Sequence, residues 1–125
     1  MRSDPCLKRW YRKINKRFFD NELPSDVCVR WADPDEEEEV EWEEKYFGWA
    51  TPADADNSYH SYVIILSRDR RNSVVDKLAT LAHEMVHVAT DCRDDHGPAF
   101  DDWHKRLTYN GLFKKHALIR GATLF

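Results

Sequence analysis

The chain contains the pattern His-Glu-x-x-His at His83-Glu84-Met85-Val86-His87, and the expected architecture is built around it. An α-helix advances ~100° and ~1.5 Å per residue, so His83 and His87 project from the same side about one turn apart. Two imidazoles placed in this way can bind one metal ion. Glu84 lies on the same flank, where it can accept a proton from a water that the metal activates. The pattern therefore predicts a metal-binding helix with a carboxylate base beside the ligands.

The residues around the motif fit a helix from Val74 to Asp91. Its apolar positions fall on one broad arc of a helical wheel, whereas the two histidines fall on the opposite, polar stripe. Ser73 and Asp76 have the spacing of a capping box, which marks a helix start. Because the histidines lie outside the apolar arc, the simpler interpretation as ordinary core histidines is disfavoured.

Two further helices are expected, one near each end of the chain. Asp4-Pro5 begins an amphipathic helix that stops at residues 21–24, and its apolar residues recur every three or four positions. Pro98 opens the other helix, which Asn110-Gly111 ends. The tail over 112–125 has no clear pattern.

Three strand-like patterns lie between the first helix and the metal-binding helix. Residues 27–31 alternate apolar and polar side chains, which predicts a strand with one buried face. Residues 46–50 and 59–66 predict two more strands, separated by a turn over 51–58. The order helix, three strands and two helices, with no linker, predicts a single α+β domain over 1–125.

Residues 33–44 contain nine acids and no base. Such a concentration of one charge favours a solvated loop. Residues 39–43 also alternate charged and apolar side chains, so a short edge strand there is the alternative interpretation.

The opposite charge is concentrated in the first helix, whose six cations are Lys8, Arg9, Arg12, Lys13, Lys16 and Arg17. They lie opposite the apolar residues, and Lys8, Arg12 and Lys16 form one stripe that we expect to be solvated. A solvated face accounts for this spacing, and contact with DNA phosphates is the alternative.

The composition of the chain limits the class of protein and the cellular compartment that we expect. A chain of 125 residues is long enough for one domain with its own core. Its three scattered cysteines, without a Cys-x-x-Cys pair, provide neither a disulfide framework nor a zinc ribbon. No stretch approaches the ~18 apolar residues of a membrane span. We therefore expect a soluble intracellular protein with no membrane partner, cytoplasmic or, in a eukaryote, nuclear.

The residues alone leave the third metal ligand open, because zinc accepts imidazole, thiolate and carboxylate donors. The candidates soon after the motif are Asp91, Cys92, Asp94, Asp95 and His96. A side chain that stabilises the oxyanion is equally open among Tyr46, Tyr59, His60, Tyr62, His104 and Tyr109. His60, His104 and His116 lack ligand spacing and are expected at the surface or behind the ligands.

Several segments together resemble the SprT-like family of zinc metalloproteases, which includes the Spartan proteases of DNA–protein crosslink repair. The matching segments run in the family's order over residues 10–107: Asn15, Phe18-Phe19, Glu22-Leu23-Pro24, the strand that ends at Trp31, Phe47-Gly48-Trp49-Ala50, Ile64-Ile65-Leu66-Ser67, Leu81-Ala82 with the motif, and His96-Gly97-Pro98-Ala99-Phe100 with Trp103.

The resemblance implies a compact zincin-like core with an N-terminal helix, a three-stranded antiparallel or mixed sheet and two active-site helices. It implies one Zn²⁺ held by His83, His87 and His96, with Glu84 as the general base of a metalloendopeptidase. It also implies protein substrates that are bound or crosslinked to DNA.

Three other kinds of site have weaker support. A metzincin would carry glycine and histidine where this chain has Thr90 and Arg93. A non-catalytic zinc domain that binds nucleic acid or a partner has no use for Glu84 beside its ligands. A zinc hydrolase that acts on something other than protein is compatible with the motif alone.

Overall fold

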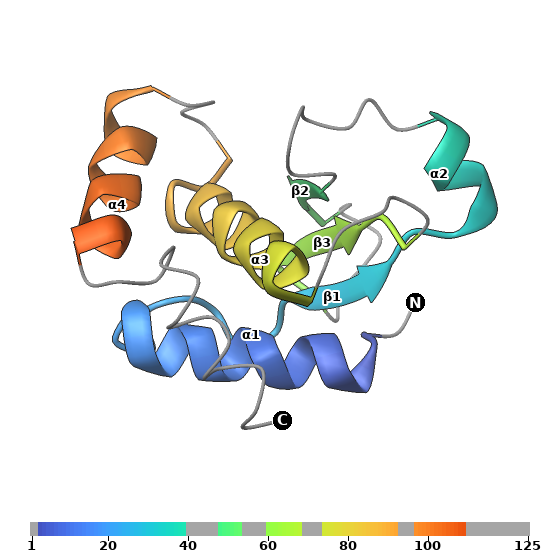
Figure 1. Cartoon of the computed structure of the whole chain (residues 1–125), viewed down its shortest axis with the longest axis horizontal. Coiled ribbons are helices and arrows are strands. Elements are labelled where there is room, and N and C mark those ends of the chain that lie inside the picture. The colour runs from blue at the N-terminus through green and yellow to red at the C-terminus, as the bar shows by residue number, and fades with distance from the viewer. Residues whose placement is uncertain (1–2, 40–47, 54–59, 69–73, 93–96, 110–125) are drawn as a thin grey trace.

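The computed structural model describes residues 3–39, 48–53, 60–68, 74–92 and 97–109. Within these ranges the chain forms helices α1 (Pro5–Phe18), α2 (Pro34–Glu39), α3 (Val74–Ala89) and α4 (Pro98–Tyr109), and strands β1 (Cys28–Trp31), β2 (Gly48–Pro52) and β3 (Tyr62–Leu66). Figure 1 shows α3 lying between the sheet and α4, with α1 along one side. The predicted α+β class is confirmed.

The sheet is mixed, with β3 in the centre. β3 pairs in parallel with β1 and antiparallel with β2, in the order β1-β3-β2. Val29 and Ala50 both pair with Ile64, so these three side chains share the face that packs on the main core. This face and the apolar residues of α1 and α3 form the hydrophobic core on which the His-Glu-x-x-His motif rests.

The prediction that the first strand buries only one face is wrong. Cys28 and Val29 are adjacent and therefore point to opposite faces, yet both are 0% exposed. Cys28 packs with Val63 and Ile65 in a second, smaller cluster on the side of the sheet away from α3. Both faces of β1 are therefore covered where the strand begins.

Helix α1 forms as predicted and ties the N-terminal region to the sheet. The Asp4 carboxylate caps it by accepting hydrogen bonds of 3.0 Å from the backbone N–H groups of Cys6 and Leu7. The buried Asn15 side chain donates to the Leu23 carbonyl and accepts from the Leu23 N–H, both at 3.1 Å. These bonds hold the turn that leads from α1 toward β1.

The prediction of a loop throughout the acidic segment is wrong for residues 34–39, which form α2. Asp33 and Glu36 make a reciprocal capping box, with bonds of 2.9 and 3.0 Å. The Arg30 guanidinium binds the Glu36 carboxylate at 2.6 and 2.7 Å, and this hydrogen bonding lowers the pKa of Glu36. Glu37 accepts bonds from Ser67 Oγ and the Arg68 N–H. These acids therefore hold the segment against the sheet.

Other expected boundaries shift by a few residues or lie outside the described ranges. β2 runs through Pro52, where a turn was expected, and β3 begins at Tyr62. The alternative edge strand over 40–43, the Ser73 cap, the turn over 54–59 and the tail over 112–125 lie outside the described residues. None of the helices in the described ranges is long and apolar enough to cross a membrane.

Candidate metal centre

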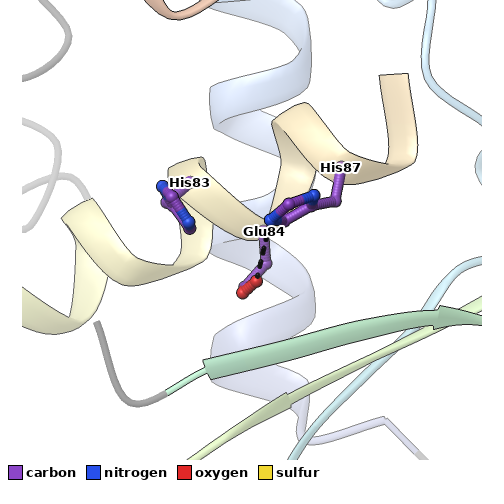
Figure 2. Close-up of side chains that lie close together, drawn as sticks. All are labelled: His83, Glu84 and His87. Carbon is purple, nitrogen blue, oxygen red and sulfur yellow. Dashed lines mark ion pairs between the residues drawn. The ribbon is translucent and has the colours of Figure 1, made fainter. Parts of the chain in front are cut away.

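His83, Glu84 and His87 come together on α3, as the helical spacing predicts. One ligand atom from each lies within 4.8 Å of those from the other two. The two imidazole rings are nearly perpendicular, with centroids 5.2 Å apart, and His87 Nε2 lies 3.9 Å from Glu84 Oε1. In Figure 2 both rings lie on one side of α3, and the Glu84 carboxylate extends toward β2. This group could hold a metal ion.

The polar stripe of α3 is turned into the protein. Thr80, His83, Glu84 and His87 are only 3%, 2%, 1% and 7% exposed. Burying imidazoles and a carboxylate is unfavourable unless each is hydrogen-bonded, paired or bound to a metal. Three of these residues, His83, Glu84 and His87, form the candidate site, and most of the other described side chains of α3 from Leu78 onward belong to the apolar core.

Helix α4 covers the two histidines with an aromatic side chain. The buried Phe100 ring lies 5.1 Å from His83 and 4.6 Å from His87, measured between ring centroids. His104, one turn further along α4, lies 5.9 Å from His83. Phe100 is not among the site residues predicted from the sequence, although a large apolar residue in the first turn of a mostly polar helix is a usable signal. His104 is half-buried, and of the two places expected for it the structure supports the one close to the candidate ligands.

The chain turns sharply after α3. Asp91 and Cys92 both have left-handed backbones, with φ of 56° and 54°, and the Cys92 N–H donates to the His87 carbonyl at 2.7 Å. The Asp91 carboxylate accepts a hydrogen bond from the Tyr62 hydroxyl. This turn anchors the end of α3, and it ends four residues before the expected third ligand in the sequence.

Two of the candidate third ligands fall within the described residues. Asp91 is engaged by Tyr62, and neither Asp91 nor Cys92 belongs to the group of close ligand atoms on α3. Burial, reinforced by the charges of Asp91 and Glu84, raises the pKa of Cys92 to about 11. His96, Asp94 and Asp95 lie outside the described residues, so the choice of His96 stays a prediction.

The expectation that Lys8 belongs to a solvated stripe of α1 is wrong. Its ammonium donates to the carbonyls of Ser25 and Val27 and lies 4.9 Å from the centre of the Tyr11 ring. Burial, and then the nearby charge of Arg12, lowers the pKa of Lys8. The exposed cations of α1 are Arg9, Arg12, Lys13, Lys16 and Arg17.

A comparison with family models gives a match to the model described as the SprT-like family over residues 7–117. The match includes every strand, α2, α3 and α4, and nearly all of α1. No curated protein and no solved structure matches the chain.

Proposed function

Because the chain belongs to the SprT-like family, which is generally associated with metalloprotease activity, we propose that it is a zinc-dependent metalloendopeptidase. The observation that carries the proposal is the buried group of His83, Glu84 and His87 on α3. Catalytic zinc sites typically use three protein ligands, often imidazoles, and keep a further position open for water and substrate. In this proposal His83, His87 and His96 are the ligands of one Zn²⁺.

Glu84 and Phe100 have separate tasks beside the two histidines. Zinc, when bound, supplies a Lewis acid that acidifies a water and polarises the peptide carbonyl. Glu84 accepts the proton of that water at its carboxylate and then delivers it to the leaving amine nitrogen. Phe100 packs over His83 and His87 and limits their contact with solvent, which keeps the two imidazoles in one orientation.

The alternative function is a non-catalytic domain, stabilised by zinc, that binds nucleic acid or a partner. A structural zinc site is closed by four protein ligands and has no need of a base. A carboxylate that is 1% exposed and lies 3.9 Å from a ligand nitrogen is better explained by proton transfer. The geometry therefore favours the enzyme.

Proteolysis is tested by incubating the zinc-loaded protein with an unfolded protein substrate. We expect new peptide termini, detected by mass spectrometry, that disappear when the metal is removed with a chelator and return when zinc is restored. A zinc-loaded and folded protein that cleaves no unfolded substrate would contradict the proposal.

We further propose that the substrates are proteins bound or crosslinked to DNA, and the exposed cations of α1 support a phosphate contact. Single-stranded DNA should then raise proteolysis at low salt, and this stimulation should weaken steeply between about 50 and 200 mM salt as counterion release loses its advantage. Charge reversal at Arg9, Arg12 and Lys16, which share one side of α1, should remove the stimulation and leave zinc content unchanged.

The matched control for the triple variant is Lys105→Glu, since Lys105 is an exposed cation on α4. It should keep the response to DNA. Lys8 is left intact because its ammonium holds the turn before β1. If DNA does not raise proteolysis at low salt, or if DNA still stimulates the triple variant, α1 does not contact DNA.

A further inference from the structure

Gly48, the first residue of β2, lies directly against the side chain of Glu84. A Cβ atom at position 48 would be 2.7 Å from Thr80 Cγ2, 2.9 Å from Glu84 Cγ and 3.1 Å from Glu84 Oε2. Carbon atoms in ordinary contact rest about 3.5–4.0 Å apart, so the strand and the helix approach more closely than any side chain at this position allows. The φ of Gly48 lies outside the left-handed region, so the requirement for glycine comes from space.

The Glu84 carboxylate is confined between β2 and the two imidazoles. Figure 2 shows it extending from α3 toward the start of β2, and its Oε1 lies 3.9 Å from His87 Nε2 on the other side. Gly48 pairs with Leu66 of the central strand, and Leu66 is buried in the main core. The surface that limits Glu84 is therefore a fixed part of the sheet.

We propose that Gly48 is a positioning residue for the general base. Its missing side chain leaves room for the Glu84 carboxylate on the β2 side of α3, so that the carboxylate can act as a base beside the two histidines and is not pushed into the ligand set. This inference rests on the proposed role of Glu84 in proteolysis. The competing explanation is that Gly48 serves only the packing of β2 on α3, through Thr80 as much as through Glu84.

Positioning and packing predict different results for Gly48→Ala. The added methyl group pushes the Glu84 side chain away from β2. The carboxylate can then move only toward the two imidazoles. The carboxylate then moves toward the metal, so that the variant keeps its metal while kcat falls about 10²-fold, the lower end of what a positioned base contributes. KM stays near the wild-type value because β2 remains paired with β3. A packing defect would instead lower thermal stability and metal retention together.

The test compares Gly48→Ala with wild type in the zinc and the Co²⁺ forms. Zinc has a filled d shell and no useful spectrum, whereas the visible bands of Co²⁺ respond to the atoms that bind it. We expect Gly48→Ala to retain metal, to lose kcat with little change in KM, and to change the Co²⁺ spectrum. Thr51→Ala is the matched control in the same strand, since Thr51 pairs with Val63 on the face away from α3. It should keep the wild-type spectrum and kcat.

Ile14→Val provides a comparator that loses stability without touching Glu84, because it removes one buried methylene from α1. It should melt at a lower temperature and keep the wild-type Co²⁺ spectrum. If Gly48→Ala does not fold, Thr80→Ser is added to it, which removes the atom in the closest contact and leaves both contacts with Glu84. The double variant should show the same spectral change and the same loss of kcat.

A Gly48→Ala protein, or the rescued double variant, with wild-type kcat and an unchanged Co²⁺ spectrum would overturn the positioning role. So would a loss of kcat that follows metal loss with no spectral change. Glu84→Gln separates this failure from a failure of the proposed function. If Glu84→Gln is inactive and Gly48→Ala has the wild-type kcat and Co²⁺ spectrum, only the inference about Gly48 is wrong. Full activity in Glu84→Gln would instead exclude Glu84 as the general base.

Discussion

Glu84→Gln is expected to keep the fold and the bound metal and to lose about 10²–10⁴-fold in kcat for peptide-bond cleavage, the usual contribution of a general base. The amide fills the same space against Gly48, but it cannot accept a proton from water. Because Glu84 is 1% exposed, a buffer molecule has poor access to the site and cannot easily replace Glu84 as the proton acceptor. The measurements are kcat and KM on an unfolded substrate, metal content and the thermal unfolding curve.

Glu22→Gln is the control for this substitution, since Glu22 is exposed and lies in the turn after α1. It should retain full activity. Wild-type turnover in Glu84→Gln would exclude the proposed mechanism, and simultaneous loss of the metal would show that Glu84 is a ligand.

Removal of the third ligand is expected to have the second large effect. His96→Ala should lower zinc from about one ion per chain to a small fraction, because a site with three protein donors loses one of them. Zinc content after dialysis, measured by mass spectrometry, checks this result. In the wild-type protein zinc affinity should also fall as the pH is lowered, since imidazole binds a metal only in its neutral form.

Cys92→Ala is the matched control for His96→Ala. The substitution keeps the backbone N–H that bonds the His87 carbonyl, and alanine can form the turn no worse than cysteine. Zinc should remain near one ion per chain in this variant and in Asp94→Ala. The opposite outcome, with zinc lost in Cys92→Ala and kept in His96→Ala, would show that the ligand assignment is wrong.

The features that local sequence encodes were predicted well. Asp4 followed by Pro5 marks the start of α1, and Pro98 marks the start of α4, because a cap and a proline act within one turn of the helix. The approach of His83, Glu84 and His87 follows from helical periodicity alone. These predictions needed no knowledge of which elements pack together.

The features that the sequence did not reveal depend on contacts between distant segments. α2 is held by Arg30 and by Ser67, which lie outside the acidic run. The loop prediction considered only the repulsion among the acids of the run, and it was therefore wrong for α2. The Lys8 ammonium donates hydrogen bonds to carbonyl groups of the turn before β1, so it is not fully solvated. The contact between Gly48 and Glu84 exists only once β2 lies on α3. The expected third ligand, His96, lies outside the described residues, so its assignment rests on the sequence.

The strand order has a consequence for the route by which the chain folds. In the described sheet β1 and β2 have no bonds to each other, and each depends on β3, which comes last in sequence. A parallel pair such as β1 and β3 also requires closure of a long connection before any pairing energy is gained. During synthesis the first two strands therefore cannot pair in the sheet until residue 66 has emerged, and α3 begins soon afterwards, at Val74. The helix that carries the motif is thus made just as the sheet that supports it becomes able to assemble.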